Sequence, residues 1–153
     1  MATLHFTISI NGSRETIFAL IADLAHYNRW LSGSRTFDGV TQVSPVPTGI
    51  GTTYVDGALH GSIIEYNAPE RITFQQSMPV KVLLLTGKLD FRVGYTLEAT
   101  GSGGQSTHVI REVIFNLQGV LRVAQPILAA TIRRESGRLL EAMKRYVESG
   151  KTN

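Results

Sequence analysis

Three polar residues of this chain each lie among apolar residues that recur at every second position. They are Gln76, Tyr95 and Arg111, in three separate stretches rich in Ile, Val and Phe. Because residues two apart in a β-strand point to the same face of the sheet, we expect these side chains to project from an apolar wall. A few polar groups on an apolar wall are typical of a small-molecule site. A shift of one residue in the register would instead place Gln75, Arg92 and Glu112 there.

The orientation of Arg111 decides what chemistry this wall supports. A guanidinium that points inward needs a partner, because a lone buried charge is costly. That partner would be a carboxylate, enolate or phenolate of a ligand, or an internal Glu. An enolate would allow catalysis, with Arg111 stabilising the developing charge while Tyr95 or Tyr54 donates a proton. The alternative is an outward Arg111 that pairs with a neighbour such as Glu98.

Other catalytic and metal-binding classes lack support in the sequence. The chain has no cysteine, which excludes thiolate metal sites and a Cys nucleophile. The histidines are dispersed, without the short spacings of metal ligands, and no nucleophile-elbow motif is present. We therefore expect no metal and no cofactor. The four histidines are His5, His26, His60 and His108.

The longest element expected is a helix from about Val120 to Ser149. Its apolar residues recur at steps of three, four or seven, which is the spacing of one helical face. Pro126 predicts either a kink or the start of the regular helix, since proline removes a backbone donor. Gly137 suggests close packing on the sheet or a second bend. The apolar stripe consists of Leu121, Leu128, Ile132, Leu139, Met143 and Val147.

The region before this helix is mostly strand. The pattern predicts a first strand over Leu4 to Ile10, a helix capped by Ser13, and a second short helix between Asp23 and Leu31 that carries Tyr27 and Trp30. Gly- and Pro-rich clusters, such as residues 45–49, 67–69 and 101–104, separate the later strands. These strands are expected at residues 35–43, 51–59, 62–66, 71–78, 89–99 and 107–117.

The run Val80 to Leu85 is apolar and lies between two expected strands. One interpretation is an extra strand or a plug in the core. The other is an apolar lip at the mouth of a pocket.

Composition and charge limit the partners. At 153 residues with 42% hydrophobic residues, the chain is expected to form one domain over residues 1–153. The net charge of +3 comes largely from a C-terminal helix whose Arg and Lys alternate with Glu, which indicates a solvated face rather than a nucleic-acid site. No signal peptide and no membrane-spanning segment are expected, so we expect a cytoplasmic protein. Both a monomer and a homodimer remain open.

Several sequence phrases resemble the START-like (SRPBCC) superfamily, and within it the polyketide cyclase/dehydrase-like proteins, close to the Bet v 1-type lipid carriers. They are residues 13–18 (SRETIF), 21–24 (IADL), 27–30 (YNRW), 49–54 (GIGTTY) and 64–72 (IEYNAPERI). This resemblance spans essentially the whole chain. It implies an α+β helix-grip fold, in which a curved seven-stranded antiparallel sheet wraps around a long C-terminal helix, with two short helices after the first strand.

Together, pattern and resemblance predict a cavity between sheet and helix that binds a small hydrophobic or aromatic, lipid-like or polyketide-like ligand. One alternative is an aromatase/cyclase- or dehydrase-like enzyme that uses the same cavity, with Arg111, Tyr95 and Tyr54 as catalytic candidates. Another is a co-chaperone-like or membrane-peripheral interaction module. The residues expected to line the cavity are Trp30, Tyr54, Phe74, Gln76, Tyr95, Arg111, Leu128 and Ile132.

Overall fold

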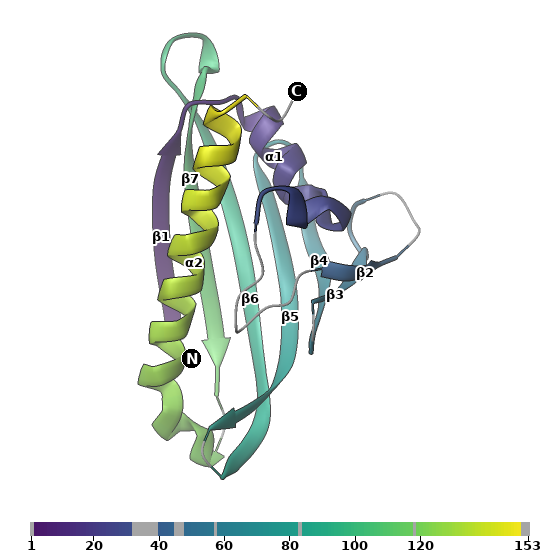
Figure 1. Cartoon of the computed structure of the whole chain (residues 1–153), viewed down its shortest axis with the longest axis vertical. Coiled ribbons are helices and arrows are strands. Elements are labelled where there is room, and N and C mark those ends of the chain that lie inside the picture. Colours follow the sequence, from purple (N-terminus) through teal and green to yellow (C-terminus); the bar gives the residue numbers. More distant parts are fainter. Residues whose placement is uncertain are drawn as a thin grey trace.

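One antiparallel sheet and one long helix form most of the structure (Figure 1). This computed structural model describes residues 2–31, 40–44, 48–56, 58–82, 84–117 and 119–150. The strands lie in the order β1-β7-β6-β5-β4-β3-β2. Their bounds are β1 Ala2–Ile10, β2 Val40–Val43, β3 Thr53–Asp56, β4 Leu59–Asn67, β5 Arg71–Val82, β6 Leu85–Thr100 and β7 Ser106–Asn116.

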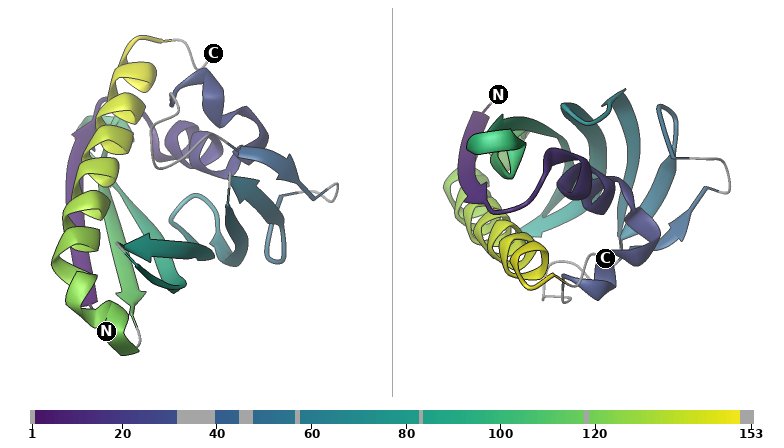
Figure 2. Two further views of the ribbon diagram at one scale, coloured as in Figure 1. Left: turned by 60° about the horizontal axis from the view of Figure 1, so that its bottom comes forward. Right: turned by 90° about the horizontal axis from the view of Figure 1, so that it is seen from above.

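The helices lie on the concave side of this sheet, which bends around them (Figure 2). Helix α1 (Arg14–Ala22) follows β1 and is capped by the Ser13 hydroxyl, which accepts from the Thr16 N–H at 3.2 Å. Short 3-10 segments are η1 (Leu24–Arg29), η2 (Ser102–Gly104) and η3 (Gly119–Ala124), and the long helix is α2 (Gln125–Glu148). The expected α+β class, the antiparallel sheet and the long C-terminal helix are confirmed, and the arrangement is consistent with the helix-grip fold.

Helix α2 begins at Gln125, five residues later than Val120, because Pro126 lies in its first turn. A proline there sacrifices no hydrogen bond, since the first N–H groups of a helix have no partner within it. Of the two interpretations of Pro126, the start of the regular helix is therefore confirmed. The interpretation of Gly137 as a close-packing site is wrong, because a methyl group added there would meet no atom of the described structure within 4 Å.

The stripe of α2 is buried unevenly. Leu140, Met143 and Val147 in the C-terminal half are buried in the core. Leu128 and Ile132 in the N-terminal half are only partly buried. The helix is therefore anchored at its C-terminal end, while its first turns leave space against the sheet.

The run Val80 to Leu85 belongs to a long hairpin. Strand β5 continues through it to Val82, which pairs with Leu85 at the start of β6. The interpretation as an extra strand is therefore wrong, because the described residues of the run lengthen both neighbouring strands, and Val80 and Leu85 are partly buried against the core. Strand β2 begins at Val40 among the described residues, and the earlier part of the expected strand (residues 35–39), the turn at 45–47 and Gly57 lie outside them.

The strand register confirms the expected inner face. Tyr95 lies opposite Ile72 on β5 and opposite Arg111 on β7, and Gln76 lies opposite Phe91. On the outer face, Arg92 donates to Gln75 at 3.4 Å. The alternative register, with Gln75, Arg92 and Glu112 inside, is wrong.

No helix in the described part of the chain is both long enough and apolar enough to cross a membrane.

The uneven burial of α2 leads to a stability prediction. We expect Leu140→Ala to lower the free energy of unfolding by about 2–5 kcal/mol, because it leaves a hole in a packed core. The matched change Leu128→Ala should cost less than about 2 kcal/mol, since this side chain already borders empty space. Urea unfolding of both variants measures the difference, and equal losses would contradict the uneven packing.

Candidate functional site

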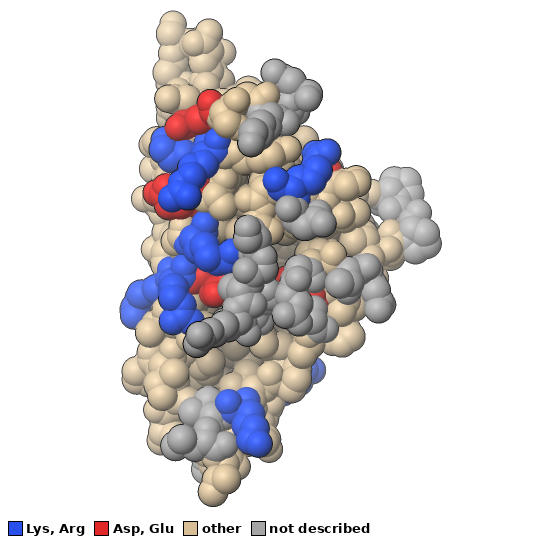
Figure 3. Space-filling model, viewed as in Figure 1, with Lys and Arg blue, Asp and Glu red and all other residues tan. Residues whose placement is uncertain are grey.

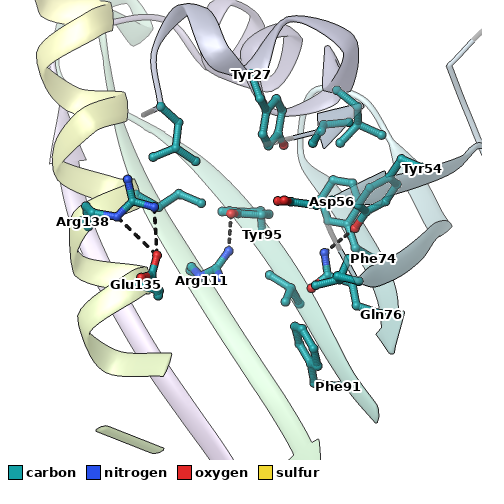
Figure 4. Close-up of a pocket in the computed structure, with 16 residues that line it drawn as sticks. Tyr27, Tyr54, Asp56, Phe74, Gln76, Phe91, Tyr95, Arg111, Glu135 and Arg138 are labelled. Atoms are coloured by element: carbon teal, nitrogen blue, oxygen red, sulfur yellow. Dashed lines mark hydrogen bonds and ion pairs between the residues drawn. The ribbon is translucent and has the colours of Figure 1, made fainter. Parts of the chain in front are cut away.

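A cavity of about 100 Å³ lies between η1, the middle of α2 and the inner face of the sheet. We call it the inner chamber (Figure 4). Its wall is mainly apolar and aromatic, with Phe74, Phe91 and Val93 from β5 and β6. The polar side chains on this wall are Tyr27, Tyr54, Asp56, Gln76, Tyr95, Arg111, Glu135 and Arg138.

Arg111 is held at the wall of this chamber by neutral groups. Its Nε donates to the Ser136 hydroxyl on α2 at 3.1 Å, and one terminal nitrogen donates to the Tyr95 hydroxyl. The guanidinium carbon lies 5.2 Å from the centre of the Tyr95 ring, a favourable cation–π distance. The outward orientation, with Glu98 as partner, is therefore wrong.

Arg111 makes no ion pair with any carboxylate in the described part of the chain. The nearby acid Glu135 is paired with Arg138 of the same helix at 2.9 Å (Figure 4). An internal Glu, one of the partners considered from the sequence, is therefore occupied by another arginine. The positive charge of Arg111 remains available to an anion in the cavity.

Two tyrosines add neutral donors to the chamber. A guanidinium or amide N–H can only donate, so the Tyr95 hydroxyl accepts from Arg111 and the Tyr54 hydroxyl accepts from Gln76. Each phenolic proton is then free for an acceptor in the cavity. Burial raises the pKa of both phenols above the ordinary value of 10.0, which keeps them protonated.

Asp56 and Tyr27 complete the polar lining. The Asp56 carboxylate points from β3 into the chamber, toward the side that carries Tyr95 (Figure 4). Tyr27 comes from η1 and donates its hydroxyl proton to the Ile21 carbonyl. The chamber thus combines donors on Arg111, Tyr95 and Tyr54 with two carboxylates, Asp56 and the Glu135 that pairs with Arg138.

A second cavity of about 220 Å³ adjoins the first, and we call it the outer chamber. The two share Phe91, Arg111 and Glu135 as lining residues. The outer chamber lies between the end of the β5–β6 hairpin and the first half of α2, and its wall includes Met78 and Val80. A cavity of about 150 Å³ is enough to hold a benzene molecule, so this chamber can take an aromatic ring.

The structure divides the residues expected to line one cavity. The inner chamber contains Tyr54, Phe74, Gln76 and Tyr95, the outer chamber contains Leu128 and Ile132, and Arg111 borders both. Trp30 lines neither, because its ring packs against Tyr27 with centroids 5.0 Å apart and faces a different surface groove. The role of these residues in ligand binding stays a prediction.

Sequence reasoning missed Tyr27, Asp56, Glu135, Ser136 and Arg138. Two signals were available. Asp56 lies two residues after Tyr54 and so shares its face of β3. Ser136 lies four residues after Ile132 and interrupts an otherwise apolar helical stripe, which marks a polar group aimed at the sheet.

No group of three or more His, Asp or Glu side chains that could hold a metal ion lies within the described ranges.

The sequence profile of the family described as "Polyketide cyclase / dehydrase and lipid transport" matches residues 1–148. No curated protein matches the chain in sequence. Among solved structures, a Mesorhizobium loti protein is similar with a TM-score of 0.68 and 13% identity, over 97% of this chain and 98% of that one. An Aha1 dimer from Colwellia psychrerythraea is similar with a TM-score of 0.67 and 15% sequence identity, and the match covers 99% of each chain. A point mutant of Thalictrum norcoclaurine synthase, bound to a transition-state analogue, is similar with a TM-score of 0.69 and 12% sequence identity. The match covers 98% of this chain and 96% of the synthase chain. Identities this low show a shared fold only.

The raised pKa values predict how stability depends on pH. The folded state holds the phenolic protons of Tyr54 and Tyr95 more tightly than the unfolded chain does. Their contribution is therefore complete below pH 10 and is lost as the pH rises above 10 toward the raised values. We expect tyrosinate absorbance to show fewer ionised tyrosines in the folded than in the unfolded protein above pH 10. Full ionisation near pH 10 with the protein still folded would contradict the buried phenols.

Proposed function

Because this chain belongs to the polyketide cyclase/dehydrase and lipid transport family, we propose that it binds a small hydrophobic or aromatic molecule with an anionic or carbonyl oxygen. The observation that carries this proposal is the position of Arg111 between two chambers without a carboxylate partner among the described residues. A ligand anion would complete the pairing that a partly buried charge requires.

The donors define the ligand further. Arg111, Tyr95 and Tyr54 all donate toward the inner chamber, so the ligand should bring oxygen acceptors there. The outer chamber is lined mainly by apolar side chains, such as Leu89, Val113 and Leu128, and suits a ring or an alkyl segment. The proposed ligand is therefore elongated, with its oxygen near Arg111 and apolar parts on either side.

The experiment compares 2-naphthoate with 2-naphthamide, which differ mainly in charge. We expect Arg111→Met to weaken 2-naphthoate binding by about 10- to 150-fold. This ratio of dissociation constants corresponds to the loss of one charge-assisted hydrogen bond of about 1.5–3 kcal/mol. Binding of 2-naphthamide should change by less than about threefold. Isothermal titration calorimetry measures both affinities.

The control is Arg92→Met, which removes an exposed arginine on the outer face of the same sheet. It should leave both affinities unchanged. If Arg111→Met weakened both probes equally, or if the wild type bound neither, the proposed role of the Arg111 charge would be refuted.

Asp56 favours a second candidate function, the cyclisation of a polyketone. Its carboxylate points into the chamber that also holds Arg111 and Tyr95 (Figure 4). Asp56 would take a proton from a carbon between two carbonyl groups. Arg111 and the neutral Tyr95 would stabilise the negative charge on the resulting enolate oxygen. The enolate carbon would then form a C–C bond to an internal carbonyl carbon, and the protonated Asp56 would return its proton to the alkoxide that this forms.

This candidate predicts a separation of turnover from binding. With a linear triketone ester as substrate, Asp56→Asn should lower the cyclisation rate by about 10²- to 10⁴-fold, the usual contribution of a general base. Its affinity for 2-naphthoate should stay near that of the wild type, since the donors remain. Product formation is followed by liquid chromatography. A wild-type rate no faster than buffer would exclude the enzyme and leave the carrier.

A further inference from the structure

Three large apolar side chains are exposed at the end of the molecule where β5 joins β6. Leu84 in the hairpin turn is 95% exposed, Val123 in η3 is 76% exposed and Ile127 in the first turn of α2 is 59% exposed. Figure 1 places these three elements together at its lower end. We call these residues the apolar tip. Apolar side chains that gather in one exposed place indicate an interaction surface.

The hairpin and the helix start are in direct contact at this end. A methyl group added at Gly87 of β6 would lie only 2.1 Å from a methyl carbon of Leu121 in η3, so the Gly87 backbone packs against that side chain. Gly119 borders the same small surface hollow as Thr86 and Lys88. The apolar tip is therefore carried by two elements that pack against each other.

Residues of the same hairpin and helix also line the outer chamber. Val80 and Lys81 line the chamber from the hairpin side, and Leu128 lines it from the helix side. In the sequence, Leu128 follows Ile127 of the apolar tip directly, and Lys81 precedes Leu84 by three positions. The outer chamber and the apolar tip therefore draw on the same hairpin and the same helix start.

Basic residues lie on the same hairpin and the same η3 segment as the apolar tip. Lys81, Lys88 and Arg122 are all exposed. Among the described residues, Lys88 forms an ion pair with Asp90 at 3.7 Å. Both side chains are more than half exposed, so this pair is weak. In Figure 3, the described residues at the lower end of the visible face include Lys or Arg atoms but no Asp or Glu atoms.

We propose that the apolar tip inserts into the surface of an anionic lipid membrane, with Lys81, Lys88 and Arg122 contacting the headgroups. Apolar side chains ringed by basic ones match the two layers of such a membrane, an apolar interior under a negative surface. Three side chains at a narrow end are too few for a typical protein interface, which covers about 800 Å² on each partner. Docking would open the outer chamber to the bilayer, and this last step rests on the proposed ligand site.

Vesicle co-sedimentation tests the docking. We expect the wild type to bind vesicles of equal parts phosphatidylcholine and phosphatidylglycerol, and to bind phosphatidylcholine alone at least about fivefold more weakly, since each basic residue near an anionic surface contributes about this factor. Leu84→Asp and Val123→Asp should each lower binding to the mixed vesicles by a similar factor or more. The matched control is Ile50→Asp. The Ile50 side chain is likewise exposed, at 72%, but it lies in the turn before β3.

A charge series completes the test. Lys81→Glu and Arg122→Glu should weaken binding to mixed vesicles, whereas Arg92→Glu, on the outer sheet face, should not. Absence of vesicle binding would overturn the docking proposal and would favour a protein as the partner of this surface. Equal binding to both kinds of vesicle, or equal losses for Leu84→Asp and Ile50→Asp, would overturn it as well.

The two proposals fail in different ways. Arg111→Met removes the charge of the ligand site but lies away from the apolar tip, so it should sediment with vesicles as the wild type does. Binding of 2-naphthoate in solution without any vesicle binding would overturn membrane docking alone. Vesicle binding without any affinity for 2-naphthoate would refute the ligand site and leave the docking surface.

Discussion

The structure depends on how it accommodates one positive charge between the sheet and the long helix. Arginine stays protonated in proteins and carries five N–H donors, so Arg111 cannot become neutral when it is partly buried. Hydrogen bonds to the Tyr95 and Ser136 hydroxyls and the face of the Tyr95 ring compensate part of its lost hydration. These partners are all neutral. The compensation is therefore incomplete by one negative charge, and the cavity beside Arg111 is where that charge fits.

Helix α2 is tied to this charge at its middle. The Ser136 hydroxyl of the helix accepts a hydrogen bond from Arg111 of β7 at 3.1 Å. Leu140, Met143 and Val147 then anchor the C-terminal half in the core. The N-terminal half runs beside the end of the β5–β6 hairpin, where Leu128 and Ile132 are only partly buried and line the outer chamber. The outer chamber results from a helix that is held closely at one end only.

The sequence predicted what depends on local periodicity. Alternation along the strands placed Gln76, Tyr95 and Arg111 on one face, and this held because a shift of one residue would have moved every apolar neighbour into solvent. Pro126 left two interpretations open, a kink or the start of the regular helix, and the helix starts at Gln125 rather than at the expected Val120. Trp30 and Glu135 depend instead on tertiary contacts: the Trp30 ring packs on Tyr27 outside the cavity, and Glu135 turns to Arg138 rather than Arg111. No periodic pattern carries that information.

The same donors fit both the carrier and the enzyme proposed for this chain. A bound carboxylate and a transient enolate each present a negative oxygen, and Arg111 with the protonated Tyr95 and Tyr54 can stabilise either. Burial, by raising the pKa of both phenols, ensures that they act as donors rather than as bases. Proton abstraction therefore has to come from another group. The proposed binding uses only the donors of the inner chamber, whereas the proposed catalysis also uses a base, the role proposed for the Asp56 carboxylate of the same chamber.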